Sequence, residues 1–168
     1  SASDLHDRGM VDGLDSMLKI WGLSPQHLTL EITESVIMDN PTLALMNLER
    51  IRDMGIKVSL DDFGTGDSSL AYFKTLPVDE IKIDKSFVLN MRTDANDTVL
   101  VEAIIALAHK FNFTVVAEGV EDTETLVQLC NLGCDYAPGY HFSRPLPRDQ
   151  FRQWLTSYSA TRYWATGD

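Results

Sequence analysis

The stretch IKVSLDD, residues 56–62, decides between the folds that this sequence allows. Side chains alternate between the two faces of a strand, so Ile56, Val58 and Leu60 share one face while the polar residues, ending in Asp61, take the other. Strands of open parallel sheets are covered on both faces and usually read as continuous apolar runs. A polar second face that ends in a carboxylate instead suits a β/α barrel, whose active site lies at the carboxyl ends of its strands.

Three other segments show the same alternation. Glu31, Lys82 and Glu118 each stand at or near the C-terminal end of a predicted strand, opposite its apolar residues. One such residue alone is usually an ordinary surface charge at a strand end. Together with Asp61 they form a series over successive strands, and a barrel would bring them to one mouth.

Apolar spacing and turn residues predict that strands and helices alternate along the chain. The pair Asn40-Pro41 is expected to begin one helix and Asp122 another, because both are favourable helix starts. Such alternation implies a parallel sheet with right-handed crossovers. Strands are expected at residues 28–33, 56–60, 80–84, 114–118 and 134–137, and helices at about 5–21, 40–54, 69–74, 99–111, 122–132 and from 147 onward.

Two architectures fit this order of elements. The length of 168 residues favours an open doubly wound sheet, because a full barrel needs about 250 residues. However, no G-x-G-x-x-G fingerprint follows the first strand, as the nucleotide-binding version of that sheet would require. The polar strand faces favour an α/β fold of the (β/α)8 TIM type, incomplete in this chain, with about five β/α units present.

Composition narrows the class of protein. A hydrophobic content of 44% excludes disorder over most of the chain. The formal charge of −11 excludes wrapping DNA, which needs a basic face. No apolar run approaches the roughly 20 residues that span a bilayer, so no membrane segment is expected here. Cys130 and Cys134 stand without a second pair and are expected to be reduced thiols, which favours the cytoplasm, with any membrane tether upstream.

The acidic residues at the predicted mouth suggest a metal site. All-oxygen ligand sets suit Mg²⁺ or Mn²⁺ rather than zinc. The adjacent Asp61 and Asp62 allow one carboxylate to bridge two ions while the next serves only the second. Two ions about 3.5–4 Å apart clamp the attacking and leaving oxygens of a phosphoester displacement. Lys82 would hold the attacking water or offset developing charge.

Five motifs in order give a more specific indication. Together they resemble the EAL-domain family, the cyclic di-GMP phosphodiesterases, from about Ser3 to Leu155. The resemblance implies hydrolysis of one phosphodiester of cyclic di-GMP, which yields linear pGpG, in a modified (β/α)8 barrel. The motifs are LEITES at 30–35, DDFGTG at 61–66, IKIDKSF at 81–87, AEGVE at 117–121 and GYHFSRPL at 139–146.

The resemblance also implies residue roles. Glu31 and Asp61 would bind a first metal ion, and Asp61 and Asp62 a second, so a complete domain would hold two Mg²⁺ or Mn²⁺ ions. Glu118 would act beside the second ion as a ligand or general base. Lys82 would orient the attacking water.

Three further positions are expected to support or modify the site. Glu34 would hold the loop after Asp62 in shape, or would merely cap the next turn. Glu121 would lie in the surrounding shell or near a guanine. Pro138 stands where the family has glutamine, and proline offers neither a side-chain donor nor a backbone N–H.

The match covers only the C-terminal portion of the family's pattern. The E-A-L strand and the asparagine of the next strand are absent, so residues 1–158 are expected to be a partial domain and 159–168 a tail. This chain alone would then be inactive, within a parent that carries an upstream sensory or GGDEF-type domain. Open barrel edges make a homodimer plausible. The alternatives are a non-catalytic module that serves as a cyclic di-GMP receptor or protein-interaction scaffold, and an unrelated Mg²⁺-dependent barrel.

Overall fold

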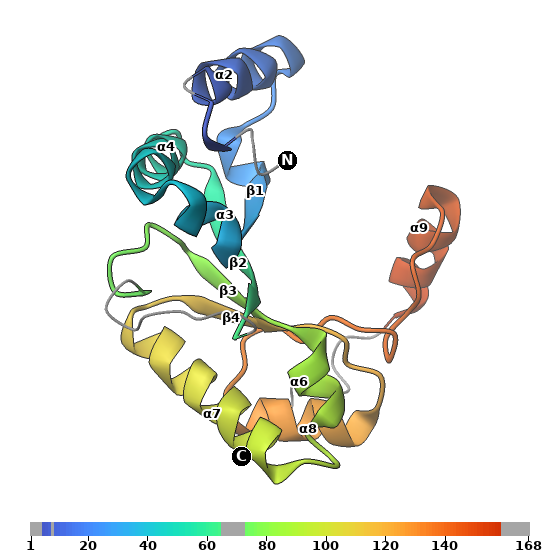
Figure 1. Cartoon of the computed structure of the whole chain (residues 1–168). Coiled ribbons are helices and arrows are strands. Elements are labelled where there is room, and N and C mark those ends of the chain that lie inside the picture. The colour runs from blue at the N-terminus through green and yellow to red at the C-terminus, as the bar shows by residue number, and fades with distance from the viewer. Residues whose placement is uncertain (1–4, 8, 65–72, 159–168) are drawn as a thin grey trace.

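A curved parallel sheet forms the centre of the structure, a computed structural model that describes residues 5–7, 9–64 and 73–158. Its strands follow one another in chain order, β1-β2-β3-β4, and each neighbouring pair is parallel. This arrangement, seen in Figure 1, confirms the parallel sheet that the alternating elements predict. The strands are β1 (Thr29–Thr33), β2 (Lys57–Phe63), β3 (Glu80–Ile83) and β4 (Thr114–Ala117).

Helices cover the apolar side of the strands. The predicted caps are confirmed: the Asn40 side chain accepts a hydrogen bond from the backbone N–H of Leu43 at 3.3 Å, and Asp122 accepts one from Thr125 at 2.8 Å. In Figure 1, α2–α4 lie near β1 and β2, α6–α8 lie beyond β4, and α9 stands apart. The helices are α2 (Met10–Trp21), η1 (Pro25–His27), α3 (Glu34–Asp39), α4 (Pro41–Asp53), α6 (Lys85–Asn90), α7 (Ala95–Lys110), α8 (Thr123–Asn131) and α9 (Arg148–Ser157).

The core lies between the sheet and these helices. Val58, Leu60, Ile81 and Ile83 are completely buried, as the apolar strand faces predict. Burial of such side chains stabilises the fold by roughly 1.5–3 kcal/mol each. The apolar faces therefore anchor the strands and leave their polar faces on the other side of the sheet.

Several predicted boundaries are wrong. The helix that ends at Trp21, α2, begins at Met10 rather than near residue 5, and α7 begins at Ala95, earlier than predicted. Two short helices, α3 and α6, follow β1 and β3 directly and were not expected. The expected helix at 69–74 falls mostly on residues 65–72, outside the described residues.

The expected fifth strand at 134–137 is also wrong, since it forms only an isolated bridge between Tyr136 and Val116. The Asp135 carboxylate accepts a hydrogen bond from the backbone N–H of Val115 at 2.8 Å, so this N–H is not available for strand pairing before Tyr136. Pro138 has no N–H with which to continue it in the other direction. Instead the Pro138 carbonyl accepts a hydrogen bond from Val120 at 3.2 Å.

In the part of the chain that the structure describes, no helix is long and apolar enough to cross a membrane.

Candidate functional site

The Lys82 ammonium forms ion pairs with the acidic residues at the carboxyl ends of the strands. The Lys82 Nζ lies 2.7 Å from Glu118 Oε1 and 3.2 Å from Glu31 Oε1. It also lies 3.2 Å from Asp61 Oδ1. These residues come from β1, β2, β3 and the residue after β4, so the structure brings together the four side chains that strand alternation places on one face.

The register of the sheet explains this convergence. Thr33 pairs with Asp61 across β1 and β2, and Lys82 pairs with Val116 across β3 and β4. The backbone N–H of Glu118 extends the ladder by donating to the Ile83 carbonyl at 3.2 Å. Because all strands run in the same direction, their carboxyl ends meet at one edge of the sheet.

Lys82 is the most enclosed member of this group, with a side chain that is 11% exposed against 55% for Glu31. Burial disfavours its charged form, but hydrogen bonds to the three carboxylates outweigh burial. The pKa of Lys82 is therefore raised above its ordinary value, and the ammonium stays charged. We call Glu31, Asp61, Lys82 and Glu118 the lysine cluster.

Asp62 occupies an irregular point in the sheet beside this cluster. The register of β2 against β3 shifts between Leu60 and Phe63, and Asp62 adopts a left-handed backbone with φ 54°. Its N–H donates to the Asp61 carboxylate at 3.1 Å. Such a backbone is costly for a residue other than glycine and is often found at functional sites.

Electrostatic repulsion acts on the Asp62 carboxyl. Burial raises its pKa, and the nearby charges of Asp61, Asp84 and Glu118 raise it further. Its side chain also shares a hydrogen bond with that of Asp84. Crowding of carboxylates in this way favours a positive charge among them.

For Asp84, strand alternation predicts an inward-facing side chain with no role beyond an ion pair of the barrel. Its carboxylate caps α6 by accepting hydrogen bonds from the backbone and hydroxyl of Ser86. Burial opposes ionisation of Asp84, but these hydrogen bonds lower its pKa overall. The aspartate two positions before Ser86 is a helix-start pattern that could have revealed both α6 and this cap.

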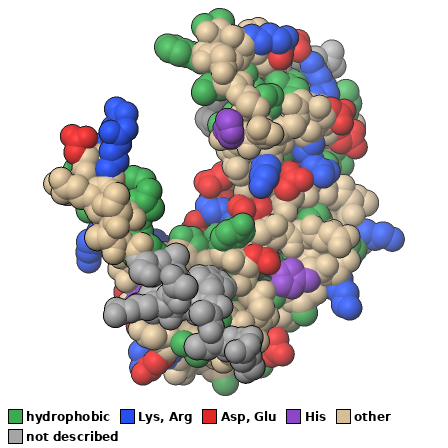
Figure 2. All heavy atoms as spheres, turned by 180° about the vertical axis from the view of Figure 1, so that it is seen from behind, with side chains coloured by type: hydrophobic (Ala, Val, Ile, Leu, Met, Phe, Trp, Pro, Cys, Tyr) green, Lys and Arg blue, Asp and Glu red, His purple; other side chains and the backbone are tan. Residues whose placement is uncertain are grey.

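A pocket of about 670 Å³ adjoins the cluster and extends toward α9. Glu118, Glu121 and Pro138 line it, together with Tyr140 and Arg144. The Arg144 guanidinium lies over the Tyr140 ring, 4.8 Å from its centroid. Sequence reasoning did not single out Tyr140 or Arg144, although both belong to the quoted motif at 139–146. The space-filling view in Figure 2 shows a hollow between the arm that carries α9 and the rest of the molecule.

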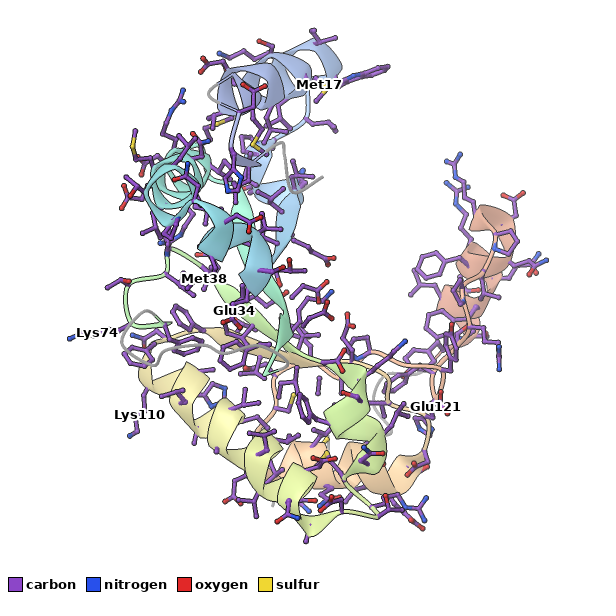
Figure 3. The ribbon with its side chains drawn as sticks, viewed as in Figure 1. Met17, Glu34, Met38, Lys74, Lys110 and Glu121 are labelled. Carbon is purple, nitrogen blue, oxygen red and sulfur yellow. The ribbon has the colours of Figure 1, made fainter. Side chains whose placement is uncertain are left out.

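Glu34 and Glu121 do not join the lysine cluster through any ion pair among the described residues. Glu34 is the first residue of α3, and its Oε2 is buried without a hydrogen-bond partner in the described part of the chain. Figure 3 shows Glu34 near the junction of β1 and α3, whereas Glu121 lies on the side of the sheet toward α9. The two glutamates therefore flank the site from different sides.

The donor set of the cluster suits a hard divalent cation. Three carboxylates meet there with Asp62 beside them, and Mg²⁺ and Mn²⁺ prefer such oxygen ligands. Among the described residues, however, no group of three or more His, Cys, Asp or Glu side chains is arranged to hold a metal ion. The cluster carboxylates point instead at the Lys82 ammonium. The residues thus fit a metal ion by chemistry, in an arrangement centred on lysine.

Comparisons with known proteins agree with this geometry. The chain is 42% identical over 157 residues to the cyclic di-GMP phosphodiesterase NbdA of Pseudomonas aeruginosa, which covers 94% of this chain. It is 43% identical over 157 residues to the oxygen sensor protein DosP of Escherichia coli, with 92% of this chain covered. The chain spans about a fifth of the length of these curated relatives, 20% in each case.

Solved structures give the same result. The MucR phosphodiesterase of Pseudomonas aeruginosa, in complex with c-di-GMP, matches with a TM-score of 0.85 and 42% identity. The match covers 90% of this chain and 61% of that chain. The neighbours are TIM-barrel domains, so the sheet described here is part of such a barrel, as the polar strand faces predict. The EAL domain family model matches residues 1–145, and the chain belongs to the EAL domain family.

Proposed function

We propose that this chain forms part of a domain that hydrolyses cyclic di-GMP to linear pGpG in a reaction that depends on two metal ions. The lysine cluster is the observation that carries the proposal, because it places three carboxylates and one ammonium at the barrel mouth. The relatives support the substrate, since NbdA is a cyclic di-GMP phosphodiesterase and MucR is solved as a phosphodiesterase–c-di-GMP complex.

Each acidic residue has a proposed role. Glu31 and Asp61 would hold a first Mg²⁺ or Mn²⁺ ion, and Asp61 and Asp62 a second. Such ions stabilise the charge that develops on the phosphate oxygens during hydrolysis. Glu118 would act as a ligand or as the general base that takes a proton from water, and Lys82 would orient that water.

Residues around the cluster would support it. We propose that Glu34 holds the loop after Asp62, which its buried Oε2 supports. Glu121 would meet a guanine of the substrate, since it lines the pocket beside Glu118. Residues 1–158 would form the partial domain and 159–168 a tail.

Pro138 favours a second candidate, a non-catalytic module that binds cyclic di-GMP or a partner protein. It lines the same pocket as Glu118 but presents a pyrrolidine ring there, without a hydrogen-bond donor. If the glutamine that the resemblance implies serves the reaction, Pro138 would weaken turnover while leaving a pocket for ligand.

The wider context is also proposed. The parent protein would join this domain to an upstream sensory or GGDEF-type domain, and the domain would associate as a homodimer. A cytoplasmic location agrees with the free thiols of Cys130 and Cys134. The 168-residue chain alone would be inactive, because the solved neighbour MucR extends well beyond the matched part.

Turnover by the complete domain tests the proposal. Purified protein would be incubated with cyclic di-GMP and Mn²⁺, and pGpG would be measured by liquid chromatography. Glu118→Ala should lower the rate by about 10²–10⁴-fold if Glu118 is the general base. Glu124→Ala is the matched control, because Glu124 is exposed on α8 and pairs with Arg92 away from the site.

The two candidates give opposite results in this assay. Absence of turnover together with retained cyclic di-GMP binding would refute the enzyme and support the receptor. Restored turnover in Pro138→Gln would then locate the defect at that position. Equal rates for Glu118→Ala and the wild type would refute the role given to Glu118.

A further inference from the structure

Every hydrogen-bond donor of the Lys82 ammonium is already engaged in this structure. A lysine ammonium has three N–H donors. The hydrogen bonds of Nζ go to Glu118, Asp61 and Glu31, one carboxylate from each of three different chain segments. In this arrangement no donor remains with which Lys82 could orient a water molecule.

The oxygens that Lys82 occupies are the same ones that a metal ion would need. Glu31 Oε1 and Asp61 Oδ1 both lie 3.2 Å from Nζ, and these residues are the proposed ligands of the first ion. An ammonium and a divalent cation compete for such carboxylates, because each neutralises the same negative charge. A divalent ion seated between these two oxygens would take the place that Nζ holds in the present geometry.

Charge makes an exchange favourable once a divalent ion is available. The three cluster carboxylates and the ammonium carry a formal charge of −2, and Asp62 adds to it close by. A single lysine therefore neutralises the cluster only in part. It suffices to hold the strand ends together, while leaving negative charge that attracts a stronger cation.

We propose that Lys82 is a built-in counterion that exchanges with a divalent cation. In the metal-free protein it would tie β1, β2 and the end of β4 together. On cation binding it would give up Glu31 and Asp61, which frees donors for water. This inference rests on the proposed metal-dependent function and adds that lysine limits the affinity of the cluster for metal.

The test compares Lys82→Met with the wild-type chain, using Mn²⁺ alone as the probe. Methionine keeps the apolar stem and removes the charge. In EDTA the variant should melt at a lower temperature, by roughly 5 °C, because three carboxylates lose their shared partner. Isothermal titration should then show Mn²⁺ binding at least about tenfold tighter than in the wild type, since a competing positive charge is gone.

Two variants serve as controls. Lys57→Met makes the same substitution at an exposed lysine on β2, outside the lysine cluster, and should leave Mn²⁺ affinity unchanged. Adding Glu31→Gln to Lys82→Met should abolish the gain in affinity, which places the ion at the cluster. Equal or weaker Mn²⁺ binding by Lys82→Met would overturn the proposal.

A second measurement covers the case in which Lys82→Met does not fold. Lysine side-chain NMR of the wild-type chain would be recorded during a Mg²⁺ titration, with Lys82→Arg identifying the signal. A Lys82 signal that moves in step with Mg²⁺ binding supports exchange, whereas binding without movement overturns it. Neither measurement uses cyclic di-GMP, so failed turnover in the complete domain would count against the proposed function alone.

Discussion

Gly119 offers a quantitative test of how the end of β4 is held beside α6. Its backbone is left-handed, with φ 78°. A Cβ added there would lie 2.7 Å from the Cβ of Lys85, the first residue of α6. Carbon atoms normally approach to about 3.5–4.0 Å, so α6 or the strand end must move by about 1 Å. Because Glu118 is the preceding residue, such movement would also displace its carboxylate.

Gly133 provides a matched control for this substitution. It has nearly the same backbone, with φ 80°, but a Cβ added there would meet nothing within 4 Å. Gly133→Ala therefore isolates the cost of left-handed alanine, roughly 1–2 kcal/mol. Gly119→Ala adds an overpacking cost of about 1–3 kcal/mol.

Urea denaturation followed by circular dichroism measures both free energies of unfolding. The expected result is that Gly119→Ala loses about 1–3 kcal/mol more than Gly133→Ala, with the same m-value. Equal losses would mean that α6 does not press on the end of β4, contrary to the contact between Gly119 and Lys85.

Three further predictions concern other parts of the chain. Asp122→Ala should lower the free energy of unfolding by about 1 kcal/mol at pH 7, because the helix cap is lost. Hydrogen bonding from Thr125 lowers the Asp122 pKa, so the stabilisation is complete above the ordinary value of 3.8 and is lost as pH falls below it. Denaturation of the wild type and the variant at pH 7 and pH 3 would show whether the difference in stability disappears at the lower pH. Burial raises the pKa of Cys134 to about 11, so the native thiol should react slowly with Ellman's reagent at pH 8. Rapid modification of this residue, located by mass spectrometry, would contradict its burial. Asn47→Ala should lower the free energy of unfolding by about 1–3 kcal/mol, since the buried Asn47 amide donates to the Leu5 carbonyl at 2.7 Å. Hydrogen exchange near residue 5 that is unchanged in the variant would contradict this role.

The sequence predicted the lysine cluster well because strand alternation and parallel register are both local rules. Once Leu60, Ile81 and Val115 are buried, the polar residues between such positions must face the other way. Parallel pairing then brings Glu31 and Lys82 to the same edge without any further information. The alternation of apolar and polar residues, together with parallel pairing, therefore sufficed to predict the sheet edge at which these side chains lie.

Other features depend on interactions that periodicity does not describe. Strict alternation would place Asp62 on the outer face, but the register shift after Leu60 breaks the alternation there. The helix that begins at Lys85 follows β3 without a loop, so its only local signal in the sequence is the capping residue Asp84. Pairing after β4 failed to become a strand because Asp135 and Pro138 block it on either side of Tyr136.

Cyclic di-GMP turnover as a function of Mn²⁺ concentration is the most direct measure of whether the lysine cluster supports metal-dependent hydrolysis. It would be measured for the complete domain and for Asp61→Asn, the position proposed to contact both ions. We expect wild-type turnover to rise from zero with Mn²⁺ and to saturate, and Asp61→Asn to stay inactive at every concentration. Turnover that needs no divalent ion, or that survives Asp61→Asn unchanged, would contradict metal-dependent hydrolysis at the lysine cluster.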